Sequence, residues 1–143
     1  MSDRLARMHT AEHLLSAVMR KFYGAPRNLE FHLGEKKTKC DYEVTRPLQE
    51  QDIREIETRV NAEIARDLPV TSFHLAREQA GRYDLWKVPP DHDPIRIVKI
   101  GEFDEQPCGG AHVSHTGEIG RFYISSYALR ENGRVRIRFK LDP

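Results

Sequence analysis

The chain has 143 residues, 38% hydrophobic and 31% charged, and 23 basic against 22 acidic residues leave a net charge of +1. This length and composition predict a single globular domain over residues 1–143. No segment reaches the roughly 18 apolar residues of a membrane helix, and no apolar signal segment opens the chain, so we expect a cytoplasmic protein without membrane contact. Two cysteines cannot form a disulfide framework, which agrees with a reducing compartment.

Two helices and a hairpin are predicted in the first half of the chain. Residues 3–23 predict a helix whose apolar side chains recur at spacings of three and four, namely Met8, Ala11, Leu15, Val18 and Phe22. Residues 29–33 and 38–45 predict a β-hairpin. Residues 48–66 predict a second helix with an inward face of Ile53, Ile56, Val60 and Ile64.

The second half of the chain predicts mostly strands. Residues 70–75 and 95–100 are expected to be strands, and residues 76–82 a short helix. Residues 120–130 and 134–141 predict a hairpin, with Asn-Gly at its tip as a strong turn signal. The predicted fold is therefore α+β, a mostly antiparallel sheet packed with two main helices.

Two short motifs carry metal-binding side chains. His9 and His13 are four residues apart on the first predicted helix, so both imidazoles share one face, roughly opposite the apolar stripe. Cys108 and His112 flank a Gly-Gly turn that follows a strand. Either pair alone is weak evidence, but three imidazoles and one thiolate together suit Zn²⁺. Four protein ligands are typical of a structural zinc site, whereas catalytic zinc keeps a position open.

The segment His9-Thr10-Ala11-Glu12-His13 also fits the pattern of inverted zinc proteases, in which Glu12 would be the general base. We give this interpretation little weight, because the chain is short and the Cys108/His112 pair would have no role. Glu12 lies about 100° around the helix from His13, a direction suited to a supporting or surface carboxylate.

The segments HTAEHLL (9–15) and CGGAHV (108–113) resemble the editing domains of alanyl-tRNA synthetases and their free-standing relatives, the AlaX proteins. The segments FHLGE (31–35) and TGEIG (116–120) extend the resemblance over nearly the whole chain. A related domain occurs in threonyl-tRNA synthetases, but the Gly-Gly pair favours the alanyl branch. Because the chain begins almost at the first motif, it looks like the short, free-standing type.

The resemblance implies a trans-editing hydrolase that maintains translation fidelity. Its substrate would be alanine tRNA charged with the wrong amino acid, seryl-tRNA(Ala) first and glycyl-tRNA(Ala) second. It implies one Zn²⁺ per chain and assigns His9, His13, Cys108 and His112 as the metal ligands of the catalytic site. The family commonly has Thr where this chain has Ala111, so a hydroxyl beside the metal is missing.

Substrate contacts are expected close to the two motifs. Thr10 and His32 are candidates for binding the amino acid, although a surface histidine is the plainer interpretation of His32. The backbone N–H groups of Gly109 and Gly110 could meet an oxyanion, or the two glycines could serve only the turn.

The last predicted strand carries a basic stripe. Its alternate residues are Arg134, Arg136, Arg138 and Lys140, which could contact tRNA phosphates or simply form a solvated sheet face. The competing function is a non-catalytic, zinc-stabilised RNA-binding module, in which the metal would only support the fold.

Overall fold

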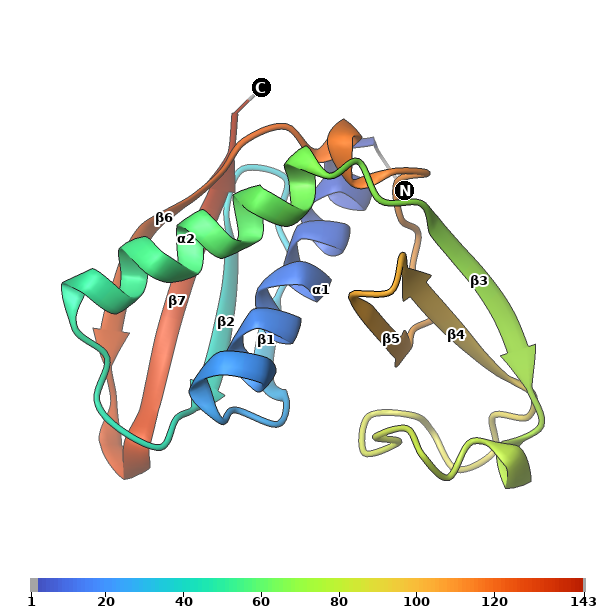
Figure 1. Cartoon of the computed structure of the whole chain (residues 1–143). Coiled ribbons are helices and arrows are strands. Elements are labelled where there is room, and N and C mark those ends of the chain that lie inside the picture. The colour runs from blue at the N-terminus through green and yellow to red at the C-terminus, as the bar shows by residue number, and fades with distance from the viewer. Residues whose placement is uncertain (1–2, 143) are drawn as a thin grey trace.

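The computed structural model describes residues 3–142, which form two helices and two antiparallel sheets (Figure 1). The first helix, α1 (Asp3–Tyr23), lies at the centre of the molecule between the two sheets. The predicted α+β class is therefore confirmed. Among the described residues, no helix is long and apolar enough to cross a membrane.

The larger sheet has the strand order β1-β2-β7-β6. It combines the two predicted hairpins, β1 (Asn28–His32) with β2 (Thr38–Glu43) and β6 (Phe122–Leu129) with β7 (Arg134–Leu141). At the tip of the second hairpin, Asn132 and Gly133 have φ values of 63° and 74°. Asn and Gly adopt this left-handed region at the lowest cost, which explains the turn.

The smaller sheet has the order β3-β4-β5. The strands β3 (Val70–Leu75) and β4 (Ile95–Ile100) match the prediction, whereas β5 (Asp104–Pro107) was not predicted. Its sequence, Asp-Glu-Gln-Pro, has little strand propensity and pairs only with β4 at the edge of the sheet. The predicted helix over 76–82 is wrong in length, because only the 3₁₀ turn η1 (Arg77–Gln79) forms before Gly81.

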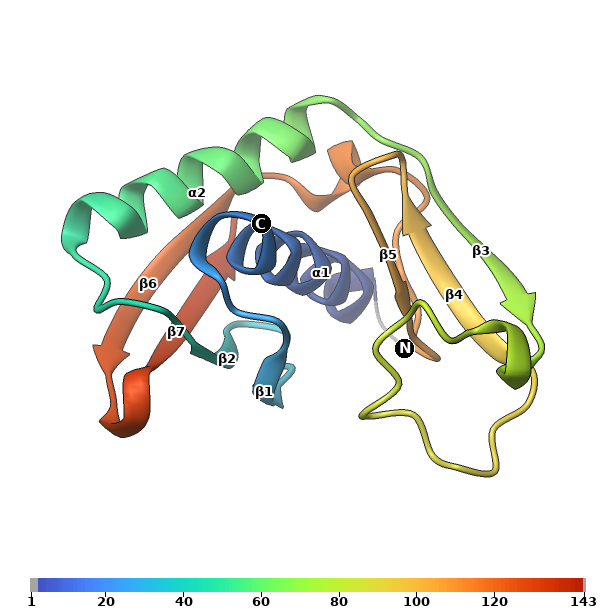
Figure 2. The ribbon, with the colours of Figure 1, turned by 60° about the horizontal axis from the view of Figure 1, so that its bottom comes forward.

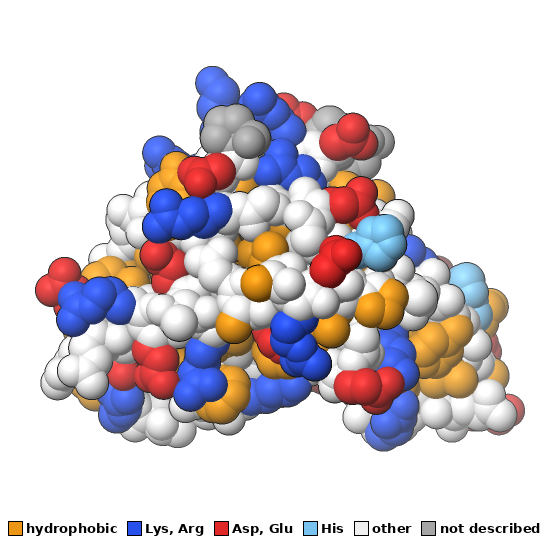
Figure 3. Space-filling view, turned by 45° about the horizontal axis from the view of Figure 1, so that its top comes forward, with side chains coloured by type: hydrophobic (Ala, Val, Ile, Leu, Met, Phe, Trp, Pro, Cys, Tyr) orange, Lys and Arg blue, Asp and Glu red, His pale blue; other side chains and the backbone are white. Residues whose placement is uncertain are grey.

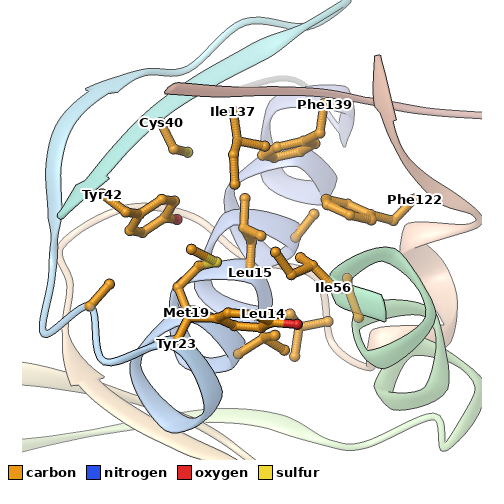
Figure 4. Packing of buried hydrophobic residues seen from close by; sticks show 14 of the residues in the cluster. Leu14, Leu15, Met19, Tyr23, Cys40, Tyr42, Ile56, Phe122, Ile137 and Phe139 are labelled. Atoms are coloured by element: carbon orange, nitrogen blue, oxygen red, sulfur yellow. The ribbon is translucent and has the colours of Figure 1, made fainter. Parts of the chain in front are cut away.

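The second helix, α2 (Glu50–Ala65), packs its predicted apolar face against α1 and β6. This face and the inner face of the larger sheet enclose the main core (Figure 4). Cys40 is buried in this core, as its alternation with charged neighbours predicted. On the outer face over α2, acidic and basic side chains are interspersed, which is typical of a solvated surface (Figure 3).

Burial of α1 extends around nearly the whole helix. Its predicted apolar stripe is buried except for Phe22, which is 48% exposed in the last turn and lies beneath the Arg59 guanidinium. The opposite side is buried as well, and it holds the polar residues His9, Glu12, His13 and Ser16. A polar helix face is therefore placed inside the molecule, where it meets β1, β2 and the segment after β5.

The N-terminus of α2 is fixed by one carboxylate. Asp52 accepts a hydrogen bond from the Gln49 N–H (2.8 Å) and two from the Arg46 guanidinium (2.7 and 2.8 Å). These bonds favour the charged form and lower the pKa of Asp52 to about 2, with the Arg46 hydrogen bond as the largest cause.

Replacement of Asp52 by Ala is expected to lower the free energy of unfolding by about 1–2 kcal/mol, because the capping box of the helix loses its carboxylate at the third position. Since the folded pKa is below the unfolded value, the stabilisation is present above pH 4 and is lost as the pH falls towards 2. Denaturant melts of the parent and the variant at pH 7 and pH 2.5 measure this. An equal gap between the two proteins at both pH values would contradict the assignment.

Candidate metal centre

The two sequence motifs meet in space although about 100 residues separate them. His9 and His13 extend from successive turns of α1, and Cys108 and His112 come from the segment after β5. One ligand atom from each of the four side chains lies within 4.8 Å of the other three. The predicted ligand set therefore forms a single cluster.

The distances within the cluster are those of ligands around one ion. The Cys108 Sγ atom lies 3.4 Å from His9 Nε2 and 3.4 Å from His112 Nε2. Tetrahedral zinc with bonds of about 2.0–2.3 Å separates its ligand atoms by roughly 3.3–3.7 Å. The two His–Cys contacts already have this spacing.

The electrostatics of the cluster keep the imidazoles neutral. Burial lowers the pKa of His9 and His13, and it lowers the pKa of His112 to about 3. Neutral imidazole is the form that binds a metal. Burial raises the pKa of the Cys108 thiol, a shift that a bound divalent cation would reverse because it stabilises the thiolate.

The imidazoles of the cluster are incompletely satisfied, and the donor set suits a metal. His9 Nδ1 and His13 Nδ1 are buried without a hydrogen-bond partner. Buried nitrogen atoms without partners are rare and costly, and three close imidazoles repel one another once protonated. The donor set of three imidazoles and one thiol fits Zn²⁺ chemically.

Thr10 holds the ring of His112. Its Oγ1 atom donates to the Ala6 carbonyl (3.0 Å) and accepts from the Val113 N–H (3.2 Å). The hydroxyl hydrogen is therefore used, and the 2.9 Å contact with His112 Nδ1 is a bond in which Nδ1–H donates. This fixes the tautomer that leaves Nε2 free to bind a metal. Thr10 was predicted to contact the substrate. In this arrangement its hydroxyl has no hydrogen-bonding capacity left for a substrate.

Replacement of Thr10 by Val is expected to weaken zinc binding by about 10- to 100-fold, because His112 loses the partner that orients it. Thr10→Ser keeps the hydroxyl and is the matched control, expected to bind within a few-fold of the parent. Competition with a chromophoric chelator measures both affinities. Unchanged affinity in the Val variant would show that this hydrogen bond does not orient the ligand.

The loop that carries Cys108 is tight, and Arg96 of the neighbouring strand β4 holds it through hydrogen bonds. The Gly110 N–H points to Cys108 Sγ (3.4 Å), so this group is engaged by the sulfur. Arg96 of β4 donates to the carbonyls of Cys108 (3.0 Å) and Gly110 (2.7 Å). Arg96 was missed from the sequence, although its alternation with Ile95 and Ile97 placed it on the opposite face of the strand.

The two glycines of this loop differ in the space around them. A Cβ on Gly110 would lie 2.6 Å from His9 Nδ1, whereas a Cβ on Gly109 would meet no atom within 4 Å. Neither glycine has a left-handed φ. Gly110 is therefore required by the close approach of His9, and Gly109 is not.

Replacement of Gly110 by Ala is expected to displace the His9 ring and to weaken zinc binding by about tenfold or more. The matched variant Gly109→Ala is expected to bind zinc as the parent does. Zinc content after dialysis and chelator competition distinguish the two. Equal losses in both variants would mean that the loop, rather than the His9 contact, is sensitive.

Glu12 belongs to the buried surroundings of the cluster. Its Oε2 atom accepts from Ser16 Oγ (2.6 Å) and Asn28 Nδ2 (3.2 Å), and the Tyr42 hydroxyl donates to Ser16 (2.7 Å). Burial raises the pKa of Glu12. Its Oε1 atom lies 3.9 Å from His13 Nε2. Glu12 is therefore a buried carboxylate that supports the cluster, as one of the two predictions had it, and it is not a surface residue.

The cluster opens into a cleft of about 390 Å³. Its wall includes three of the four ligands, His9, His13 and Cys108, together with Glu12. The opposite wall comes from the segment between β3 and β4, residues 82–88. Ligand-binding pockets for small molecules commonly have about 300–1,000 Å³, so a ligand can reach the cluster through this cleft.

Comparisons with known proteins place the chain in a family. Residues 95–138, which include Cys108 and His112, match the family described as "Threonyl and Alanyl tRNA synthetase second additional domain". Alanine–tRNA ligases of Treponema denticola, Petrotoga mobilis and Pseudothermotoga lettingae are 31%, 33% and 35% identical over 99%, 90% and 92% of this chain. The chain is a relative of these synthetase domains. The predicted resemblance is confirmed, and the chain spans 24%, 15% and 16% of the three ligases.

His32, the other side chain predicted to bind the substrate, lies away from the cluster. His32 is exposed at the end of β1 and does not line the cleft. Its neighbour Phe31 does line the cleft, with its ring 5.8 Å from that of His9. Because side chains alternate along a strand, the motif brings Phe31 to the site and turns His32 outward.

The basic stripe of β7 faces charged residues of β2. Arg136 binds Asp41 through two hydrogen bonds (2.8 and 2.9 Å), and its side chain is only 15% exposed. Its charge is thus neutralised within the protein. Among residues 3–142, no ion pair involves Arg134, Arg138 or Lys140, so these three stay candidates for a phosphate contact.

Proposed function

We propose that the chain hydrolyses the ester of mischarged alanine tRNA, seryl-tRNA(Ala) first and glycyl-tRNA(Ala) second, at a zinc site. The observation that carries the proposal is a Zn²⁺-type ligand cluster that opens into a ligand-sized cleft. Relatives named alanine–tRNA ligases supply the substrate class. The cleft favours this function over a purely structural zinc module, because a structural site needs no access.

The proposed ligands are His9, His13, Cys108 and His112, with one Zn²⁺ per chain. Bound Zn²⁺ supplies a Lewis acid that can polarise the ester carbonyl or lower the pKa of water. The protein's part is to hold neutral imidazoles in a fixed tautomer through Thr10 and to shape the Cys108 loop through Arg96. Glu12 and Asn28 offer polar atoms in the cleft beside the ligands.

Serine selection follows from polar groups in the cleft. A site that hydrogen-bonds a hydroxyl rejects alanine because its buried polar atoms would then be unpaired. A size filter cannot accept serine and refuse the smaller alanine. The absence of the usual hydroxyl at Ala111 leaves this selection to other groups of the cleft, of which Glu12 lies beside the ligand His13, with Oε1 3.9 Å from its Nε2.

The same proposal gives the partner and the compartment. The partner is tRNA, with Arg134, Arg138 and Lys140 as a second electrostatic contact on the sheet face. Charging of tRNA is a cytoplasmic process, and we place the protein there.

The test is deacylation of seryl-tRNA(Ala) beside alanyl-tRNA(Ala), with protein of known zinc content. We expect rapid loss of serine with alanine retained. Cys108→Ala is expected to lower the zinc content and to reduce the rate at least 100-fold, because one ligand is lost. Cys40→Ala removes the second thiol of the chain, which is buried in the core away from the cluster. It is the matched control and is expected to keep both zinc and activity.

Zinc-loaded parent protein that cleaves neither ester would overturn the proposal for this substrate. Normal zinc content and rate in the Cys108→Ala variant would overturn the ligand set.

A further inference from the structure

Trp86 is the only tryptophan of the chain, and it is 47% exposed. It lies in the loop between η1 and β4, which runs below the smaller sheet in Figure 1. Its neighbours Leu85 and Val88 pack inward against the second core around Ile95 and Ile97. A large aromatic side chain is thus turned outward while the apolar residues Leu85 and Val88 are partly buried, and this exposure needs an explanation.

The segment that carries Trp86 is anchored on both sides. The Arg77 guanidinium donates to the carbonyls of Pro89 (2.9 Å) and His92 (3.1 Å). The backbone N–H of Trp86 donates to Asp84 Oδ1 (3.2 Å). These bonds hold the backbone around the indole, so its ring is presented from a structured loop.

Two cations flank the Trp86 ring. The Arg27 guanidinium lies 4.8 Å from the ring centroid, and the Lys87 ammonium lies 5.4 Å from it. Arg27 is paired with Asp84 (2.9 Å), whereas Lys87 is exposed and takes part in no ion pair among residues 3–142. An aromatic face beside an unneutralised cation is the combination that binds single-stranded nucleic acid.

This aromatic and basic group lines the same cleft as the metal cluster. Trp86, Lys87 and Arg27 line this cleft together with His9, His13 and Cys108. A ligand whose reactive group lies at the cluster therefore extends towards the indole. In an aminoacyl-tRNA, the ester is on the terminal ribose, and the terminal base is attached to that same ribose.

We propose that Trp86 is the stacking platform for the terminal base of the RNA and that Lys87 contacts a phosphate next to it. The inference rests on the proposed function for the direction in which the RNA enters. Stacking suits this task because it needs no base-specific hydrogen bonds and the single-stranded end is the same in every tRNA. The cleft, rather than the β7 stripe, is then the main RNA contact.

The experiment uses uncharged RNA, so that binding is measured without hydrolysis. The full-length protein is titrated with the trinucleotide CpCpA, and the fluorescence of its single tryptophan is recorded. We expect saturable quenching, because a stacked base changes the surroundings of the indole directly. The same RNA with an abasic terminal ribose is expected to give little quenching.

Variants identify the residues, with a fluorescently labelled trinucleotide as the probe. Trp86→Ala is expected to weaken binding at least fivefold, and Trp86→Phe to keep most of it. Lys87→Ala is expected to lower the salt dependence by about one phosphate contact. Phe22→Ala is the matched control, since Phe22 is equally exposed, lies beneath Arg59 at 3.7 Å and does not line the cleft.

Absence of quenching, equal quenching by the abasic RNA, or parental affinity in Trp86→Ala each overturns the platform. A fluorescence change that depends on protein concentration alone, and not on RNA, also overturns it and shows instead that the indole joins two copies. Quenching without deacylation would support the Trp86 platform and contradict the proposed function. Deacylation without quenching would support the proposed function and contradict the platform.

Discussion

Burial of both sides of α1 is the constraint on which the structure depends. One side meets the larger sheet and α2 through apolar side chains. On the other side, His9 and His13 meet the segment after β5, while Glu12 and Ser16 hydrogen-bond to Asn28 of β1 and Tyr42 of β2. Polar groups in such a position are costly unless each finds a partner. The second sheet therefore does more than cover the helix, since it delivers Cys108 and His112 to the imidazoles of α1.

The partners form two networks on either side of the ligands. On one side, Thr10 satisfies the backbone and fixes the tautomer of His112. On the other, hydroxyl groups of Tyr42 and Ser16 lead to the Glu12 carboxylate. Among residues 3–142, the buried side-chain nitrogens without a hydrogen-bond partner are His9 Nδ1, His13 Nδ1 and Arg27 Nε. The two networks hold Thr10, His112 and Glu12 in place, and a cluster held in this way is preorganised for an ion.

The two pairs of metal-binding side chains could be predicted from the sequence because helical spacing and a glycine turn act locally, and the structure brings the pairs together. The helices and both hairpins followed from periodicity for the same reason. Features set by tertiary contacts could not be predicted. Strand β5 depends on its neighbour β4, and Arg136 is neutralised by Asp41 only through the register of β7 against β2. Phe22 keeps the helical spacing but lies beyond the core, which periodicity does not reveal.

His9 and Cys108 are in contact although 99 positions separate them in the chain. A metal ion held by both would act as a removable cross-link between the first helix and the second sheet. By the chain-entropy relation, a permanent link closing a loop of this length contributes about 4–5 kcal/mol. The lifetime of the folded chain would then follow the supply of zinc, and a cell short of the metal would lose the protein to proteolysis as well as losing its activity.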